Sequence, residues 1–599
     1  MKNRFFAVLL VLSVLLSGCS ELTAPPATST APTDSGATVP TGAPVDTDLL
    51  QSDAGMFTDR DRDPAYNEKK AVTVQFNGDS AAASSNAVAI NGTNVILTAE
   101  ATYVLSGTLN DSSVIVDAGS SDKIQIVLSG VNITSNTSAA IYVKNADKVF
   151  VTLADGTENT LSNGGNFASS VDSSIDAPLF SRQDLTINGS GSLSIQSPAG
   201  HGIVCKDDLA ITGGVYSIQT AGHGIDANDS IRIAGGTLNI ESGKDGIHAE
   251  NSDDTSLGFV YLSAGTLDLK TDGDGISAGS WLQLSGGNLK ILAGGGSENG
   301  EKDHANNMMG PGGMGPGERP GGRPRSTVNV TTTEESTSVK GLKAAGNILI
   351  SAGTFTIDSA DDAIHGNTNV TVNGGDLTLK TGDDGLHADQ TLCITGGAIS
   401  ITESYEGLEA QNIVVSGGVT KLKATDDGLN AAGGTDSSGI GGNRPGGDHF
   451  FGGMGGHSDG SIVISGGDLY INASGDGMDA NGKLEITGGH TVVVGPTRGD
   501  TATLDYDISG TISGGTFIGT GASGMAQTFS DSAQGVVSVQ VGSGIAGTQI
   551  KLIAADGTEL ISYAPELDFN VVILSTPEMV KGETYTLSVG HTVQEFKAN

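Results

Sequence analysis

Hydrophobic and polar residues alternate in short runs along most of the chain, and pairs such as Gly-Gly and Asp-Gly separate the runs. The stretch GGDLTLKTGDDGLHADQTLCITGG, residues 374–397, shows the pattern, with Leu377 and Leu379 flanking one polar residue. Alternation with a period of two, bounded by turn residues, predicts β-strands, and nothing here has the helical period. The sequence therefore predicts an all-β protein.

The same unit recurs at a nearly constant spacing. Asp362, Asp384 and Glu406 follow one another at steps of 22 residues, and longer steps elsewhere contain insertions. A repeat of this length is too short for a propeller blade or a helix pair, so each unit predicts one turn of a solenoid. We expect a right-handed parallel β-helix with about 22 residues per turn and a small β module at its C-terminal end.

The first residues carry the features of an export signal. A basic start precedes an apolar run over 5–16, and LSGC at 16–19 resembles a bacterial lipobox. An apolar run this short predicts a cleaved signal rather than a membrane span. We expect lipidation of Cys19, which would anchor the protein to the membrane on the outside of the cell; the alternative is an ordinary secretory signal in which Cys19 is incidental.

Differences in composition along the chain separate predicted linkers and loops from the predicted folded part. The segment before residue 57 is rich in Ala, Pro, Thr and Ser without apolar periodicity, and two later segments are rich in Gly, Pro and Met, which favours linkers and mobile loops. The predicted segments are a lipoprotein signal peptide at 1–19, a flexible tether at 20–56, a β-helix at 57–524 with loops at 294–338 and 433–460, and a C-terminal β module at 525–599.

A formal net charge of -38 argues against nucleic acid as a partner and favours cations, or a polymer recruited through cations. Cys205 and Cys393 lie about seven repeats apart, too far for a disulfide at about 4.8 Å per repeat, so we expect inert buried thiols. We expect a monomer.

Charged residues occupy equivalent positions in successive repeats. One series, the turn column, occupies one position of the acidic turn in each repeat and includes Asp362 and Asp384; a second, the strand column, follows three residues later and includes His365, His387 and Glu409. In stacked repeats both columns share one edge. Carboxylates about 4.8 Å apart repel by about 0.9 kcal/mol in water and about 3.5 kcal/mol at an effective dielectric of 20.

Such repulsion calls for compensation by raised pKa values, by solvation or by a hard cation. Turn formation by Asp-Gly alone explains one acid per repeat but not the additional acids. Calcium accepts six to eight oxygen ligands with tolerant geometry, so we expect Ca²⁺ at this edge. The candidate ligands are Asp361, Asp362, Asp383, Asp384, Glu406, Glu409, Asp426, Asp427, Asp476 and Asp479.

Several stretches resemble a family of bacterial carbohydrate-binding β-helix proteins that is related in fold to pectate lyases and known from clostridial surface proteins. They are SAAIYVKNADKVFVTLADGTENTL at 138–161, KGLKA at 340–344, DDGLHAD at 383–389 and GTISGGTFIGTGASGMAQ at 510–527. The resemblance implies a β-helix, bound calcium at turns such as Asp361, Asp362, Asp383 and Asp384, and binding of acidic plant polysaccharides such as polygalacturonate, with cellulose as a further candidate.

These observations predict a lipid-anchored surface protein that binds acidic polysaccharide through calcium on its acidic edge. One alternative is a calcium-dependent pectate lyase with Lys340 or Lys343 as the base, although nearby carboxylates raise the pKa of a lysine and weaken it as a base. Another is a surface adhesin or spacer without sugar specificity.

Overall fold

The computed structural model describes residues 51–165, 167, 173–300, 339–431 and 460–599. The predicted signal peptide, Cys19, most of the predicted tether and most of both predicted loops lie outside these residues. Among the described helices, none is long and apolar enough to cross a membrane.

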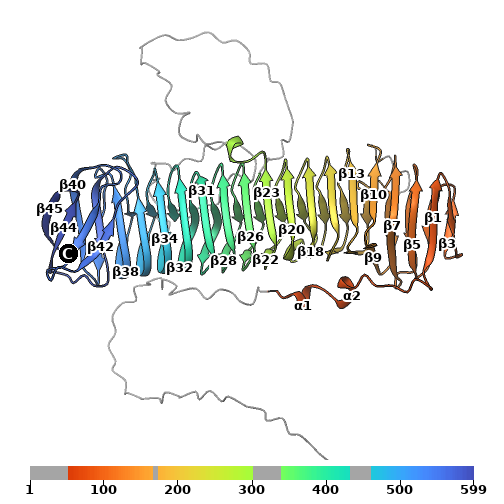
Figure 1. The fold of residues 1–599 in the computed structure, drawn as a ribbon, viewed down its shortest axis with the longest axis horizontal. Helices are drawn as coiled ribbons and strands as arrows, with labels where there is room; N and C mark the ends of the chain where they lie inside the picture. Colours follow the sequence, from red (N-terminus) through yellow and green to blue (C-terminus); the bar gives the residue numbers. More distant parts are fainter. Residues whose placement is uncertain (1–50, 166, 168–172, 301–338, 432–459) are drawn as a thin grey trace, which may run out of the picture. The chain divides into compact units, whose positions relative to one another are not determined.

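Strands of successive repeats lie side by side and pair in parallel, so that residues one repeat apart face each other (Figure 1). In the central repeats Phe355 faces Leu377, which in turn faces Ile399, and all three side chains are buried. The alternation seen in the sequence therefore sends every second side chain into one continuous apolar core, while the residues between point outward.

Each repeat contributes strands to three parallel ladders, and long strands contribute to two of them. The first ladder carries the charged columns and consists of β14 (Ile203–Cys205), β17 (Ile225–Ala227), β19 (Ile247–Ala249), β21 (Ile276–Ala278), β24 (Leu342–Ala344), β27 (Ile364–Gly366), β30 (Leu386–Ile394), β32 (Leu408–Ala424), β33 (Leu429–Ala431), β35 (Met478–Ala480) and β37 (Asp505–Tyr506).

The second ladder runs through β12 (Asp184–Gly189), β15 (Asp208–Ile211), β18 (Ser230–Ser242), β20 (Phe259–Thr271), β22 (Leu282–Leu284), β25 (Ile348–Ile350) and β28 (Asn369–Val372), and then through β30, β32, β34 (Ser461–Ala473), β36 (Lys483–Val494) and β38 (Ser509–Gly521). The third includes β10 (Glu158–Asn163), β13 (Ser192–Ser197), β16 (Val215–Thr220), β23 (Asn288–Ala293), β26 (Thr354–Ser359), β29 (Asp376–Thr381) and β31 (Ala398–Ser404).

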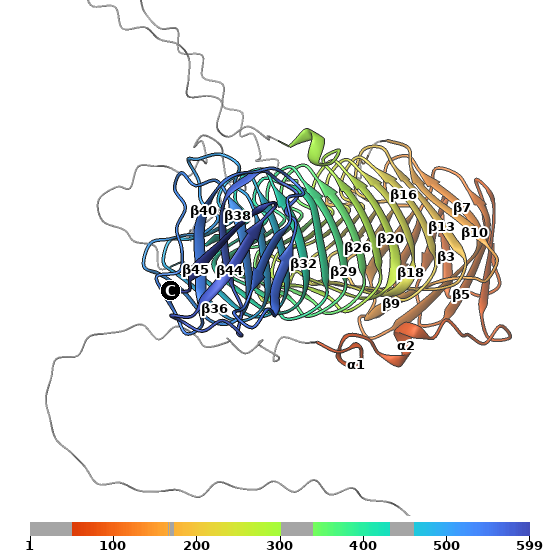
Figure 2. The same ribbon diagram turned by 60° about the vertical axis from the view of Figure 1, so that its left-hand side comes forward.

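Antiparallel pairs occur at both ends of this sheet. Near the beginning, β1 (Val72–Gly78) pairs with β2 (Ala81–Ala83), and β3 (Val88–Asn91) pairs with β4 (Asn94–Leu97). Near the end, β43 (Phe569–Ser575) lies antiparallel to both β38 and β40 (Val536–Gly544). A second sheet of four antiparallel strands is formed by β41 (Ile550–Ile553), β42 (Glu559–Tyr563), β44 (Thr584–Val589) and β45 (Thr592–Lys597); β44 and β45 are seen in dark blue in Figure 2.

The all-β prediction is confirmed, since 58% of the structure is strand. The predicted architecture, a right-handed parallel β-helix followed by a separate small module, is corrected. Instead 41 strands belong to one closed sheet, whose parallel region is extended by antiparallel strands. The repeat dictates parallel neighbours only where it is regular. Near the beginning short turns join β1 to β2 and β3 to β4 as antiparallel hairpins, and near the end β43 returns antiparallel to β38 and β40 after intervening strands.

The predicted tether ends at residue 56, and its last residues are among the described ones. Helices α1 (Asp53–Met56) and α2 (Asp59–Arg62) lie against the second ladder. The Tyr261 hydroxyl donates to Asp53 at 2.9 Å, and Phe57 packs on the Tyr261 ring. These residues lack repeat periodicity, but Phe57 and Asp61 are buried because complementary side chains of the sheet cover them.

Candidate functional site

The strand column forms a continuous row along the first ladder. Its members face each other in register, with His365 opposite His387, His387 opposite Glu409, and Glu409 opposite Asn430. Each occupies the middle of a short parallel pairing, so consecutive side chains point to the same side. The insertions at 301–338 and 432–459 leave this register intact, since Ser277 faces Lys343 and Asn430 faces Asp479 across them.

The turn column has a structural role that the sequence analysis missed. Several of its carboxylates accept a hydrogen bond from the backbone N–H of the next column member: Asp274 donates to Asp245 Oδ1 at 2.8 Å and Asp384 donates to Asp362 Oδ1 at 3.0 Å. The same bond joins Asp476 to Asp427. One oxygen of each of these acids therefore stabilises the turn above it, which leaves the other oxygen for a second partner.

In two of these turns a glycine precedes the column residue, and there it is a sequence signal that could have indicated the bond. A Cβ atom on Gly475 would lie 2.3 Å from Asp427 Oδ1 and 2.5 Å from Asp426 Oδ1. Similarly, a Cβ on Gly273 would lie 2.4 Å from Asp245 Oδ1. At these two turns a side chain would crowd the acid of the preceding repeat, whereas Asp383 precedes Asp384 and the same bond forms there.

Lys340 supplies a positive charge to the predicted calcium ligands Asp361 and Asp362. Its Nζ lies 3.0 Å from Asp361 Oδ2 and 2.6 Å from Asp362 Oδ2, and its side chain is 1% exposed. His365 Nδ1 adds a contact of 2.7 Å to Asp362 Oδ2. Burial opposes ionisation of Asp362, but Lys340 and His365 outweigh it and lower the pKa of Asp362.

His387 has the corresponding role in the next repeat. Its Nδ1 lies 2.7 Å from Glu409 Oε2 and 3.2 Å from Asp384 Oδ2, and its Nε2 lies 3.4 Å from Asp389 Oδ1. Burial disfavours the imidazolium, but the three carboxylates together raise the pKa of His387 well above its usual value. The predicted ligands Asp384 and Glu409 thus lie beside an imidazole whose charged form they favour, while burial and the charges of Glu409 and Asp383 raise the pKa of Asp384 well above its usual value.

Glu406 accepts hydrogen bonds from a neutral amide. Both its carboxylate oxygens accept hydrogen bonds from Asn430 Nδ2, at 3.0 and 2.9 Å, and the side chain is buried. The predicted ligand Glu406 thus points into the sheet edge and holds the next member of the strand column in place.

The last acidic group has a different character. Asp427, Asp476 and Asp479 each offer an oxygen, and these oxygens lie within 4.8 Å of one another. Burial, together with the charges of Asp476, Asp426 and Asp479, raises the pKa of Asp427 well above its usual value. The electrostatic environment of this group is therefore dominated by like charges, in contrast to the environment of Asp362.

The two lysines considered as catalytic bases are held in ion pairs. Lys340 is buried, so a polymer outside the sheet does not reach its Nζ without breaking two short contacts. Lys343 is 28% exposed, and its Nζ lies 3.6 Å from Asp274 Oδ2. Burial and the charge of Asp245 raise the pKa of Asp274 to about 7.

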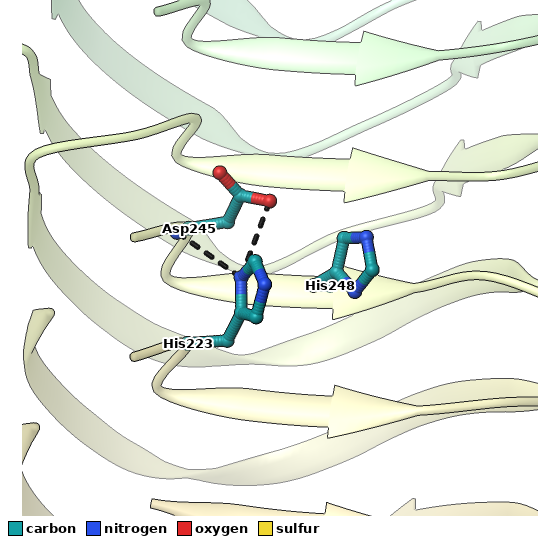
Figure 3. Close-up of side chains that lie close together, drawn as sticks. All are labelled: His223, Asp245 and His248. Carbon is teal, nitrogen blue, oxygen red and sulfur yellow. Dashed lines mark hydrogen bonds and ion pairs between the residues drawn. The ribbon is translucent and has the colours of Figure 1, made fainter. Parts of the chain in front are cut away.

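A histidine-rich group near the start of the columns was not among the predicted ligands. His223 and Asp245 belong to the turn column, whereas His248 belongs to the strand column (Figure 3). The ring centroids of His223 and His248 are 4.3 Å apart, and His201 stacks on the far side of His223 at 4.9 Å. The 22-residue spacing of His201 and His223 was the sequence signal for this stack.

Taken together, the fold and the edge define a repetitive all-β protein that displays carboxylates and imidazoles in two registered columns. Comparison with known proteins places the chain in a family: the model of the carbohydrate-binding domain-containing proteins matches residues 91–385 and 383–558. The chain belongs to this family.

Two similar proteins each match a portion of the chain. A carbohydrate-binding domain-containing protein of Acetivibrio thermocellus is 38% identical over 134 residues, which is 22% of this chain and 47% of that protein. The chain thus spans about half the length of this relative. The solved structure of a polysaccharide lyase-like protein from C. thermocellum, a gadolinium derivative, is 33% identical with a TM-score of 0.37, and covers 38% of this chain and 92% of that one.

Proposed function

We propose that this protein binds acidic polysaccharide through Ca²⁺ held at the acidic edge, with Asp427, Asp476 and Asp479 as the principal ligands. Family membership supports a carbohydrate ligand. The observation that supports calcium is the convergence of three carboxylates at one place where burial and like charge disfavour the ionised form of Asp427. A divalent cation would reverse that penalty.

The donor set fits calcium. The three carboxylates offer oxygen ligands only, and Asp426 lies beside them, since its charge contributes to the raised pKa of Asp427. Calcium prefers several oxygen ligands and tolerates irregular geometry, and its remaining positions accept water or a ligand carboxylate. The predicted ligands near Lys340 and His387 already face basic side chains of the chain. We therefore propose these acids as secondary calcium ligands, which bind the ion less favourably than Asp427, Asp476 and Asp479.

The partner follows from charge. A chain of net charge -38 repels a polyuronate such as polygalacturonate directly, whereas calcium on the edge bridges carboxylates of the two molecules. The register of the columns repeats along the sheet, and a stretched polymer repeats along its own length. Calcium at the principal ligands and at the secondary ones along the same edge would let several weak contacts form at once, and the affinity would rise through multivalency. Cellulose, which carries no carboxylates, would require a different contact.

The proposed cellular setting is the outer side of the membrane, with Cys19 as the lipidated residue and residues 20–50 between the lipid and the described residues. Within this setting the polysaccharide is a polymer outside the cell. A test is globomycin treatment of producing cells, in which an unprocessed precursor is the expected result and normal processing would contradict lipidation at Cys19.

The binding test is retention of the protein on immobilised polygalacturonate in Ca²⁺ and in EGTA. We expect retention in Ca²⁺ only, and its loss in the variant Asp427→Asn/Asp479→Asn, because both substitutions remove charged oxygen ligands. The matched control is Asp468→Asn, an acid of the same repeat whose side chain is 68% exposed. Equal retention of the double variant and the control would refute the assignment, and calcium-independent retention on unrelated polymers would favour a spacer or adhesin.

A further inference from the structure

The histidine-rich group lies several repeats away from the acids assigned to calcium, and its donor atoms are of another kind. We propose that His223, Asp245 and His248 bind one divalent first-row transition metal ion, of which Zn²⁺ is the natural probe. This site is distinct from the calcium site, and neither depends on the other.

The backbone brings these side chains together through adjacent repeats. His223 and Asp245 occupy the same position of the turns that precede β17 and β19, and His248 lies within β19. One nitrogen or oxygen of each residue lies within 4.8 Å of the others, a spacing from which small side-chain rotations bring three ligands onto one ion. Figure 3 shows both imidazoles and the carboxylate gathered on one side of the strands.

The contacts of His223 Nδ1 are in conflict without an ion. This nitrogen lies 3.2 Å from the backbone N of Asp245, which donates to it, and 3.3 Å from Asp245 Oδ2. An unprotonated Nδ1 suits the N–H and repels the carboxylate, whereas a protonated Nδ1 suits the carboxylate and opposes the N–H. A metal ion between Nδ1 and Oδ2 turns the repulsive contact into two ligand bonds, at the expense of one hydrogen bond.

The surroundings favour a dication at this place. His248 Nδ1 lies 2.8 Å from Asp226 Oδ1 and its Nε2 lies 3.4 Å from Glu250 Oε2. When one ring nitrogen of His248 ligates the ion, the carboxylate at the other nitrogen accepts its N–H and fixes the ring, as outer carboxylates do in histidine metal sites.

The choice of metal follows from the ligands. Imidazole nitrogens suit Zn²⁺, Cu²⁺ and Ni²⁺, while Ca²⁺ prefers oxygen. The side chains of His223, Asp245 and His248 are 13%, 16% and 20% exposed, so an ion reaches them from solvent and keeps an open position for water. The comparable group of Asp362, His365 and His387 is more deeply buried and contains the Lys340 ammonium, which opposes a second cation.

The test is equilibrium dialysis of the full chain against Zn²⁺ in excess Ca²⁺. His304, His449 and His457, which lie outside the described residues, are changed to Gln in every protein compared, so that they do not contribute. We expect one bound Zn²⁺ that excess Ca²⁺ does not displace, loss of that ion in His248→Gln, and retention in the control His490→Gln, whose side chain is 48% exposed. Co²⁺ should give a visible absorption band that is lost with the same variant.

A second variant keeps the test decisive if His248→Gln does not fold. Asp245→Asn removes the charged ligand but keeps an Oδ1 that accepts the N–H of Asp274, and we expect it to weaken Zn²⁺ binding at least tenfold. The proposal is overturned if the parent protein binds no Zn²⁺, if equimolar Ca²⁺ displaces it, or if both variants bind Zn²⁺ as tightly as the His490→Gln control.

Discussion

Replacement of Lys340 by Met tests whether the chain's own cation takes the place that calcium was predicted to occupy. Met fills a similar volume without charge, so the change leaves Asp361 and Asp362 facing each other without the ammonium that lies 3.0 and 2.6 Å from their oxygens. Lys340 and Asp362 are 1% and 0% exposed, so water does not take over the lost contact.

Removal of one partner from a buried ion pair costs about 3–5 kcal/mol, because the remaining charge stays desolvated. The loss is local, since each repeat contacts mainly its neighbours. The amides of Gly341 and Leu342 report it directly, because they donate to Asp362 O at 2.9 Å and to Ala363 O at 3.0 Å. At about 1.4 kcal/mol per factor of ten, their hydrogen exchange should accelerate by roughly two to three and a half orders of magnitude.

The assay is hydrogen exchange by mass spectrometry in EGTA, with Lys290→Met as the control. Lys290 pairs with Asp268 at 3.1 Å, but both side chains are about half exposed or more, at 67% and 49%, so its loss should cost no more than about 1 kcal/mol. In Lys340→Met, added Ca²⁺ should restore protection by binding Asp361, Asp362 and Asp383. Unchanged exchange in EGTA would refute the buried ion pair, and failure of Ca²⁺ to restore protection would refute calcium as a replacement for Lys340.

Two further substitutions test the docked N-terminal segment and the turn column. Asp61 is 2% exposed and contacts Lys148 at 2.8 Å and Thr186 at 2.6 Å. Burial raises the pKa of Asp61, but these partners outweigh burial and lower that pKa from 3.8 to about 2. The substitution Asp61→Asn should therefore destabilise the docked segment by about 2 kcal/mol at pH 7. This stabilisation is present above pH 4 and is lost as the pH falls towards 2. The protease susceptibility of the segment should therefore differ between variant and parent at pH 7 and become similar in acid. A difference that persists unchanged at low pH would contradict the ion pair. The substitution Gly475→Ala should destabilise the repeat by about 1–3 kcal/mol, because the added Cβ would lie 2.3 Å from Asp427 Oδ1 and 2.7 Å from Asp426 C. The assay is the unfolding midpoint in denaturant, and the control is Gly542→Ala, where a Cβ meets no atom within 4 Å. An unchanged midpoint in Gly475→Ala would show that the turn relaxes to accept the side chain.

Much of the edge could be predicted from spacing, because a constant step between repeats translates directly into register. The strand column of His365, His387 and Glu409 was read from the sequence as a row, and the structure places it in register. The antiparallel ends could not be predicted in this way, since they contain no repeat. Nor could the docking of Phe57 and Asp61, which depends on contacts with residues more than a hundred positions away, such as Thr186.

The sequence also could not show which side chain compensates the negative charge of the stacked carboxylates. Repulsion between stacked carboxylates was expected, but a column does not show whether a neighbouring Lys or His turns inward. Lys340 was considered as a base, and its position in the turn column gave equal reason to expect an internal counter-ion. Its burial decides between these roles, and burial depends on how the side chain packs rather than on where it stands in the repeat.

The edge therefore changes character along one ladder although its backbone stays the same. Around His248 the strand column offers nitrogen, at Lys343 and His387 it carries basic side chains, and around Asp479 it offers oxygen. In the turn column Asp245, Asp362 and Asp427 each use one oxygen for the backbone N–H of the next column residue, so side chains of both columns determine what the other oxygen contacts. The same backbone can therefore carry the internal ion pairs of Lys340, the proposed transition-metal site and the proposed calcium site, and the ten acids assigned together from the sequence separate into groups with different surroundings.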